Sequence, residues 1–325
     1  LRRALNAFRD PRTSRSGWEL AITFIPFLGL FALIVSLVNA GYFLALALTP
    51  LAGLFLLRLF IIQHDCGHGA FLRGRTSNDW FGRALGAFTL TPYDCWRRSH
   101  ALHHSATGNL DARGIGDVDT LTVREFKERT RWQRFLYRLY RHPLVLLGLG
   151  PAYLFLVRHR LPIGLMKEGR VYWISAMATN LVTAMLLALP IYLAGFGATA
   201  LVFFPVLLTA ASVGVWLFYI QHQFVDAHWN GQADWSFHDA ALHGSSHLDL
   251  PPILRWFTGN IGIHHVHHLA SRIPFYRLPE VLKAHPQLRT MNHYTALQTF
   301  RTLRLALWDE GQRRLVSFRE ASAKR

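Results

Sequence analysis

The sequence predicts an all-α integral membrane protein with four transmembrane helices in two hairpins and a cytoplasmic helical cap. Apolar residues make up 51% of the 325 residues and charged residues only 17%, against about 25% in soluble proteins. Residues 20–57 and 171–221 contain no Asp, Glu, Lys, Arg or His. Each run is long enough for two crossings of about 20 residues. Residues 1–325 are therefore predicted to form a single membrane domain.

The four crossings follow from the two uncharged runs, each of which has a polar or glycine-containing break near its middle. They are expected at residues 20–38, 41–62, 171–193 and 198–220. The cap is then formed by residues 63–170 and 221–325. Two shorter apolar stretches, 81–92 and 143–157, are too short to cross and are predicted to lie in the membrane interface.

The positive charge lies beside the apolar runs. Net charge is +16, with five Arg against two acids in residues 1–19 and eleven Lys or Arg against three acids in residues 121–170. By the positive-inside rule the termini and the middle segment are cytoplasmic. A multi-pass membrane protein is expected. The surplus suits anionic lipid headgroups or an acidic protein partner, and no nucleic-acid partner is predicted.

Nine histidines are grouped at the ends of apolar stretches, and neutral imidazole is a common transition-metal ligand. On a helix, residues three or four apart share a face. The predicted second and fourth crossings end just before a histidine, so all groups are expected on one side of the membrane. The nine are an HxxxH, two HxxHH and one lone residue: His64 and His68; His100, His103 and His104; His264, His267 and His268; and His222.

Nine nitrogen ligands exceed what one ion can bind, so the pattern predicts two ions with four or five nitrogens each. Zinc sites commonly need three or four ligands. A nitrogen-rich site of higher coordination favours iron, although ligand type alone leaves other metals open. A lone histidine beside an apolar helix is more often an interface residue than a ligand. Assigning His222 as a metal ligand is nevertheless favoured, because its helix ends at the same membrane depth as the other histidine groups.

Groups beside the ligands are predicted from their position in the sequence. A carboxylate can accept the free ring N–H of a ligating histidine and fix its tautomer. His265 lies between ligand positions but would point away from His264 on a helix, so we expect it beside the ligands. Loop or interface roles are expected for His228, His238, His243 and His247, and surface positions for His142, His159, His285 and His293. The predicted neighbours of the ligands are Asp65, Asp94, Asp111, Asp117 and His265.

HDCGH at 64–68, HALHH at 100–104 and HHVHH at 264–268 resemble the three histidine boxes of the membrane fatty acid desaturases. The resemblance extends to residues 108–126, 218–224, 242–278 and 307–319. The pattern is most similar to bacterial and cyanobacterial acyl-lipid desaturases of the delta-5 or omega-6 (delta-12) type. The resemblance implies that every histidine of these boxes except His265 binds iron, and a bacterial inner membrane is the location expected on the same ground. His222 matches the extra histidine that the family has before the third box.

The resemblance also implies the reaction. It implies an oxygen-dependent desaturase that introduces a cis double bond into an acyl chain carried by a lipid, using two iron ions (Fe²⁺/Fe³⁺), O2 as co-substrate and external electrons. No catalytic residue beyond the metal centre is expected. We find no fused cytochrome b5 motif at either end, so a separate donor is expected, ferredoxin in preference to cytochrome b5. Trp96, Trp216 and Trp256 are expected to line an acyl tunnel or to belong to an interfacial aromatic belt.

Other functions remain open at this point. A fatty acyl or alkane hydroxylase, epoxygenase or ketolase would use the same scaffold. A membrane zinc hydrolase or a metal-binding receptor would use the same ligands without oxygen chemistry. A metal transporter is disfavoured, because ionisable residues are expected midway along an ion path and the predicted crossings have none there.

Overall fold

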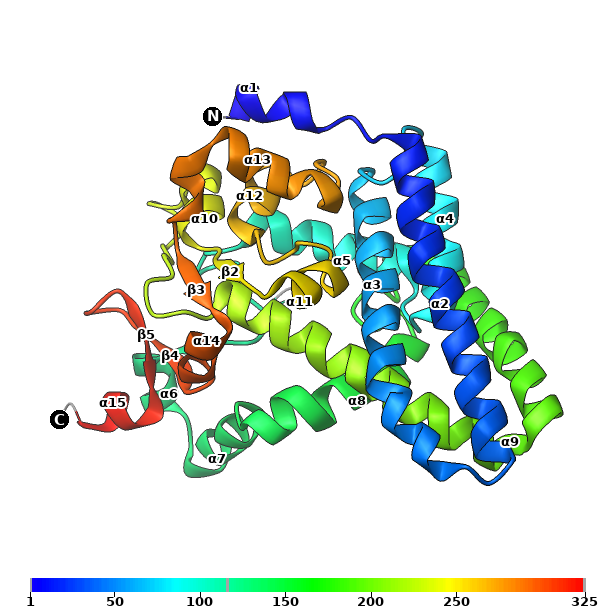
Figure 1. Ribbon diagram of the computed structural model, residues 1–325. Coiled ribbons are helices and arrows are strands. Elements are labelled where there is room, and N and C mark those ends of the chain that lie inside the picture. Colours follow the sequence, from blue (N-terminus) through cyan, green and yellow to red (C-terminus); the bar gives the residue numbers. More distant parts are fainter. Residues whose placement is uncertain (1, 115–116, 324–325) are drawn as a thin grey trace.

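The computed structural model describes residues 2–114 and 117–323, which are mostly helical (Figure 1). Three helices are long and apolar enough to cross a membrane: Thr13–Asn39, Phe43–His68 and Arg170–His222. The first is α2. The second comprises η2 (Phe43–Leu48) and α3 (Thr49–His68), and the third is α9. The prediction of long apolar helices is therefore confirmed, with three such elements where four crossings were expected.

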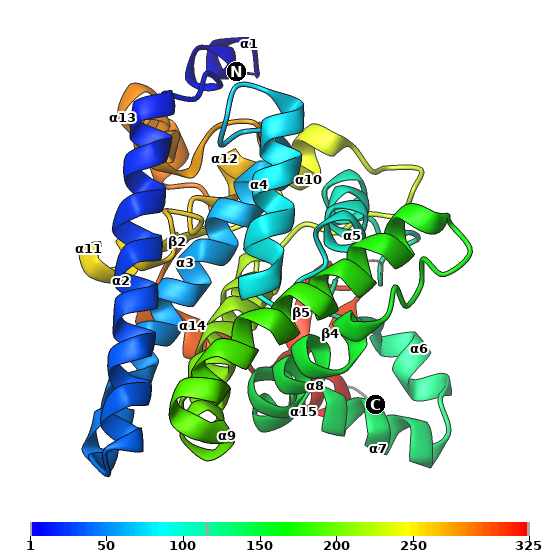
Figure 2. The same ribbon diagram turned by 90° about the vertical axis from the view of Figure 1, so that its right-hand side faces the viewer.

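The last two expected crossings lie within α9. Gly195 interrupts this helix with a positive φ of 80° and a ψ of 160°, a conformation that glycine adopts without a steric penalty. Figures 1 and 2 show α9 bending back near its middle. The two parts of the helix therefore run in different directions from this residue.

The helix ends differ from the prediction in a way that affects the site. The second apolar helix does not end at residue 62 but continues through His68, and α9 continues through His222. Gly69 ends α3 with a left-handed φ of 66°, as is common after a helix C-terminus. His64, His68 and His222 therefore lie on the last turns of the long helices, where the helix fixes their directions.

A buried ion pair joins the long helices near this end. Arg58 of α3 contacts Glu19 of α2, and its Nε lies 3.1 Å from the Thr23 hydroxyl. The same guanidinium donates to the Trp256 carbonyl and lies 4.0 Å from the centre of the Trp256 ring. A buried charge needs such partners. The pair therefore anchors the Trp256 segment, and with it the approach to the third histidine group, to α3.

Two helices follow α3 and lead to the second histidine group. α4 (Arg75–Phe88) packs along α3, and α5 (Tyr93–Ala106) follows it. A Cβ at Gly82 would lie 2.1 Å from the Tyr93 ring, so α4 and α5 approach closely at this glycine. The predicted interfacial stretches become part of α4 and the pair η3 (Val145–Leu149) and α8 (Gly150–Leu156), which packs on α9.

The cap is not all-α, which corrects the predicted fold class. β1 (Leu121–Thr122), β4 (Leu305–Asp309) and β5 (Arg314–Ser317) form a sheet of order β1-β4-β5, parallel between β1 and β4 and antiparallel between β4 and β5. β2 (His247–Asp249) and β3 (His293–Thr295) form a parallel pair. Strands of two to five residues are too short to show an alternating pattern, so the residue pattern does not predict them.

The remaining elements are short; α1 and η1 precede α2, and the others belong to the cap. α6 and α7 each open with a capping box, Thr122 with Glu125 and Thr130 with Gln133, which satisfies free N–H groups of the first turn. The short helices are α1 (Arg2–Leu5), η1 (Asn6–Phe8), α6 (Val123–Glu128), α7 (Arg131–Tyr140), η4 (Arg158–Arg160), α10 (Phe237–His243), α11 (Pro252–Phe257), α12 (His264–Leu269), η5 (Phe275–Arg277), α13 (Leu278–Ala284), η6 (Pro286–Arg289), α14 (Ala296–Thr302) and α15 (Phe318–Ala323).

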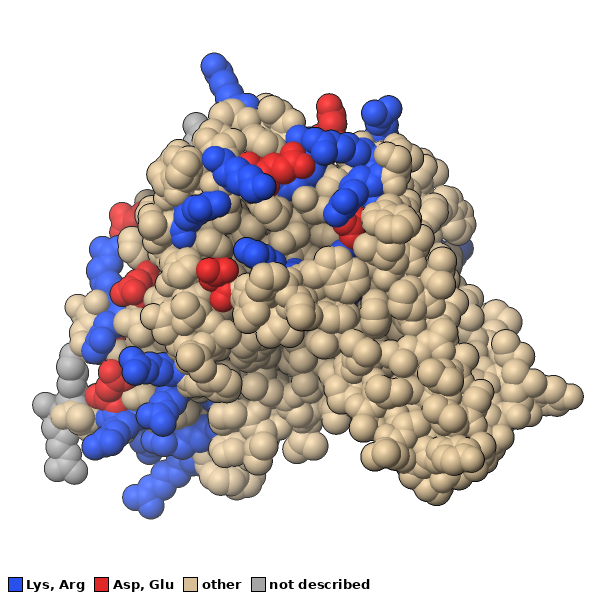
Figure 3. All heavy atoms as spheres, viewed as in Figure 1, with Lys and Arg blue, Asp and Glu red and all other residues tan. Residues whose placement is uncertain are grey.

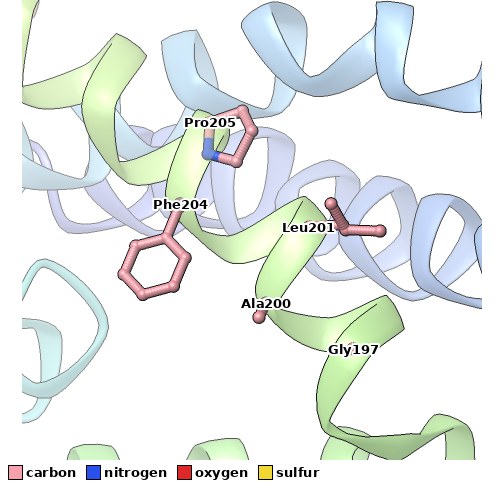
Figure 4. Close-up of a pocket in the computed structure, with 5 residues that line it drawn as sticks. All are labelled: Gly197, Ala200, Leu201, Phe204 and Pro205. Atoms are coloured by element: carbon pink, nitrogen blue, oxygen red, sulfur yellow. The ribbon is translucent and has the colours of Figure 1, made fainter.

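The surface separates into a charged and an uncharged part. Figure 3 shows Lys, Arg, Asp and Glu over the cap, whereas the lower right of the same face, at the far ends of α2 and α9, carries none. Figure 4 shows an apolar hollow on α9 after its bend, lined by Gly197, Ala200, Leu201, Phe204 and Pro205. At 1.5 Å per residue, Pro205 lies about 25 Å along the helix from His222. This hollow is therefore remote from the histidines.

Candidate metal centre

All nine predicted histidines meet in two adjoining groups. The group of five contains His64, His68, His100, His104 and His267, and the group of four contains His103, His222, His264 and His268. Within each group the ligand nitrogens lie within 4.8 Å of one another. The ends of α3, α5, α9 and α12 supply them. The sequence predicted this convergence but not which histidine belongs to which group.

Helix geometry explains the division. In α5, His100 and His104 are one turn apart and share the group of five, while His103 points into the group of four. In α12 the assignment is reversed: His264 and His268 share the group of four, while His267 enters the group of five. Consecutive helix residues differ in direction by about 100°. Each HxxHH therefore serves both groups, and the stacked rings of His104 and His268, 4.1 Å apart, join them.

The nitrogen spacing suits bound cations. In the group of five, Nε2 of His100 lies 3.0 Å from Nε2 of His68 and 3.1 Å from Nε2 of His104, which lies 3.2 Å from Nε2 of His267. In the group of four, Nε2 of His264 lies 2.9 Å from that of His222 and 3.0 Å from that of His268. Two ligands at right angles around a metal with bonds of about 2.1 Å are about 3.0 Å apart.

Hydrogen bonding alone does not explain this arrangement. A neutral imidazole has a single N–H, so Nε2 of His100 cannot satisfy both of its nitrogen neighbours. Nε2 of His103 is buried and has no hydrogen-bond partner among the residues described. A cation would attract all these lone pairs at once. The donor set, which consists of imidazole nitrogens alone in both groups, therefore fits a pair of transition-metal ions.

The electrostatics keep the rings in the ligand form. Desolvation, followed by the neighbouring imidazoles, holds the pKa values of five cap histidines well below the ordinary value for histidine. The rings are therefore neutral at physiological pH, and a metal need not displace a proton from them. These five are His100, His104, His264, His267 and His268.

Two predicted carboxylates and one carbonyl orient the ligand rings. Nδ1 of His103 lies 2.8 Å from Oδ1 of Asp117, and Nδ1 of His64 lies 3.3 Å from Oδ1 of Asp65. Burial would raise the pKa of Asp117, but the adjacent His103 holds it below its ordinary value. Nδ1 of His222 lies 3.3 Å from the Gly244 carbonyl. The sequence carries no signal for this last contact, because every residue has a carbonyl.

Three predicted neighbours of the ligands bond elsewhere. Asp94 forms a bidentate pair with Arg83. It does not face the histidines, because it lies six residues before His100 and therefore on another face of α5. Asp111 accepts from the Gln232 backbone N–H at 2.7 Å and so fastens two loops. His265 points away from both groups, with Nε2 lying 2.9 Å from the Leu288 carbonyl. His228, His238, His243 and His247 belong to neither group.

Aromatic rings that sequence reasoning did not assign to the ligands border the centre. Phe218 of α9 lies 4.9 Å from the ring of His103 and 5.5 Å from that of His222. Trp96 stacks on His100 at 4.6 Å and 17°, and Phe60 meets Trp96 edge-on at 5.5 Å. Phe60 and Phe218 come from the long apolar helices. These rings therefore give the centre an apolar wall on the side of those helices.

Replacing Asp117 by asparagine is expected to lower metal affinity and turnover by about 10–100-fold, the usual cost of losing a partner of a ligating histidine. The amide keeps the size of the side chain but not the charge that faces Nδ1 of His103. Metal content after dialysis and turnover of the purified protein measure the effect. Asp111→Asn is the matched control, since Asp111 bonds to Gln232 instead; an equal loss in both variants would contradict the assigned role.

Comparison with known proteins identifies what this site resembles. A family model described as fatty acid desaturase matches residues 40–300. The chain is 41% identical over 320 residues to a fatty acid desaturase of Bacillus subtilis (strain 168), covering 98% of this chain and 90% of that protein. It is 32% identical over 241 residues to the sn-1 acyl-lipid omega-3 desaturase (ferredoxin) of Synechocystis sp. (strain ATCC 27184 / PCC 6803 / Kazusa), covering 70% and 63%.

The same Synechocystis strain has an sn-1 oleoyl-lipid 12-desaturase that is 27% identical over 228 residues, covering 67% of this chain and 62% of that protein. These relatives therefore include both omega-3 and 12-desaturases. They support the desaturase family and do not single out the predicted delta-5 or omega-6 type.

Proposed function

Because the chain belongs to the fatty acid desaturase family, whose members are oxidoreductases, we propose that its two histidine groups each hold one iron ion and that it desaturates the acyl chain of a membrane lipid. The observation that carries this proposal is the division of nine imidazoles into two adjoining groups of five and four. When bound, the iron pair supplies the redox chemistry by which O2 oxidises an unactivated methylene pair.

The protein contributes position and surroundings. The histidines hold the metal pair at the C-terminal ends of α3 and α9, and Asp65, Asp117 and the Gly244 carbonyl orient three of the rings. In this proposal, the acyl chain lies against Phe60, Trp96 and Phe218. These rings keep water away and hold a pair of methylene groups against the metal centre. Such positioning can lower the activation barrier of the reaction substantially.

The proposed membrane arrangement has four crossings. α2 and the Phe43–His68 segment make the first two, and α9 makes the other two on either side of Gly195. In this proposal the protein lies in a bacterial inner membrane, with both termini and the metal centre on the cytoplasmic side, and the positive charges beside the apolar helices support this orientation. The acyl-lipid substrate is supported by the names of the cyanobacterial relatives, and a separate ferredoxin donor by the name of one of them.

Expression in a host that lacks the corresponding double bond tests the reaction. Gas chromatography–mass spectrometry of the fatty acids is expected to show a new cis alkene at one position. A hydroxylated acid without a new alkene would make the protein a hydroxylase instead. Metal analysis of the purified protein is expected to give about two irons per chain, as the nine nitrogens require, and two zincs without iron would contradict the oxygen chemistry.

A further inference from the structure

The two histidine groups differ in their contact with solvent. All members of the group of four are buried, whereas His68, His100 and His104 of the group of five are partly exposed. An external protein must pass its electrons to the centre by tunnelling, and the rate of tunnelling falls steeply with distance. The group of five is therefore the place where electrons can arrive over the shortest path.

The outer face of α5 lets another protein come close to this group. Arg98, Ala101 and Ser105 are exposed at spacings of three and four, so they form one solvent-facing stripe, opposite the side that carries His100. Ala101 and Ser105 have short side chains. A helix with its side chains is about 10–12 Å across, so a partner seated on this stripe would lie about one helix width from His100.

Arginines lie around this exposed stripe of α5. Arg75, the first residue of α4, donates to the Gly67 carbonyl at 3.3 Å, beside His68. Asp79 pairs with Arg75 at 3.2 Å and with Arg97 of α5 at 3.1 Å. The start of α4 and the exposed side of α5 are therefore one continuous surface. We define the arginine surface as Arg73, Arg75, Asp79, Arg97 and Arg98.

The arginine surface carries a clear excess of positive charge. Its four arginines and one aspartate give a formal charge of +3. Arg73 and Arg98 are exposed, and neither pairs with a carboxylate among the residues that the structure describes. An acidic protein would be steered to such a surface, and the attraction would weaken with salt.

We propose that the arginine surface is the docking site of an acidic one-electron carrier protein of the ferredoxin class. The proposal rests on the proposed function. Each double bond removes two electrons and two protons from the acyl chain, and the carrier adds two electrons, one per docking event. With two protons from solvent, these reduce one O2 to two waters, and the oxidised carrier leaves. The arginine surface lies over the group of five, so each electron enters there.

The chain offers a matched control surface. α7 is also basic, and Arg129 and Arg131 at its start are exposed. α7 and α5 lie apart in both views of the molecule (Figures 1 and 2). If net charge alone attracted the carrier, reversing Arg129 and Arg131 would weaken docking as much as reversing Arg73 and Arg98.

The test uses the purified full chain in lipid nanodiscs and two sources of electrons. One is a plant-type [2Fe–2S] ferredoxin kept reduced by NADPH and its reductase, and the other is dithionite with methyl viologen. The double variant R73E/R98E is expected to raise the KM for ferredoxin by at least about tenfold and to flatten its salt dependence. Viologen-driven desaturation is expected to stay unchanged, and R129E/R131E to match the wild type in both assays.

Two results with these variants would overturn the docking site. An unchanged KM for ferredoxin in R73E/R98E would exclude these arginines. An equal loss with both electron sources would assign them to the lipid headgroup or to the fold. Ferredoxin binding to immobilised nanodiscs separates this proposal from the proposed function. If the wild type makes no alkene with either reductant, the desaturase activity fails, whereas binding that is lost only in R73E/R98E still supports the docking site.

Discussion

Replacing His267 by alanine is expected to reduce desaturation by more than about 100-fold, since the loss of even a hydrogen-bond partner of a ligand costs about 10–100-fold. His267 is the member of the group of five that comes from α12, and its Nε2 lies 3.2 Å from Nε2 of His104. Without His267, the group of five keeps only its four nitrogens from α3 and α5, and its side toward α12 has no ligand. Iron content is expected to fall with activity.

The measurement compares iron per chain and the alkene formed per hour in the wild type, His267→Ala and His142→Ala. His142 is exposed after α7 and belongs to neither group, so its replacement is expected to change little. Intact insertion of all three proteins into the membrane is the condition for comparing them. A His267→Ala protein that keeps full activity and two irons would remove His267 from the set of ligands.

The histidine spacing could be read from the sequence because a single helix turn determines it. Residues 100 and 104 share a face in any α-helix, and the uncharged runs end beside the histidines. What could not be read is that His103 and His104 face different groups. This division depends on how α5 and α12 approach each other, which is tertiary packing between segments more than 150 residues apart.

The four carboxylates also show that sequence position alone does not determine a tertiary contact. Asp65, Asp94, Asp111 and Asp117 all lie within or near a histidine motif in sequence, yet two of them meet a ligand ring. Asp94 lies in α5 itself, whose turn directs it to Arg83, whereas the chain after α5 folds back and brings Asp117 to His103. Proximity in sequence predicts a side-chain contact only where the intervening residues form a regular helix or strand, because its period then determines which way each side chain points.

The long apolar helices were the most predictable part of the fold, because burial in lipid demands uninterrupted runs of apolar residues. Their ends were less predictable. Residues 63–68 include Gln, Asp and two His, and so they look like the start of a loop, but His64, Asp65 and Cys66 are buried on the last turns of α3. Polar residues usually mark the end of an apolar helix. Where a metal centre lies at the helix end, polar residues are instead buried within the helix, so they do not mark its boundary.

Replacing His222 by alanine is expected to abolish desaturation and to lower the iron content from about two to about one per chain, because the smaller group keeps only three of its nitrogens. Nε2 of His222 lies 2.9 Å from that of His264, and its Nδ1 faces the Gly244 carbonyl, so the ring is held with Nε2 toward the group. Sequence alone gave this lone histidine the weakest support of the nine, which makes its loss the most informative.

His247→Ala is the matched control for this variant. His247 is also buried, but its Nδ1 lies 2.9 Å from the Arg289 carbonyl and the residue belongs to neither group. Removing it takes an imidazole of the same size from the interior, so a loss of packing would appear in both variants, while a loss of iron would appear only in His222→Ala. Iron analysis and Mössbauer spectra of both proteins separate the two effects. Two irons with unchanged spectra in His222→Ala would restrict the centre to the three histidine boxes and leave the smaller group with His103, His264 and His268.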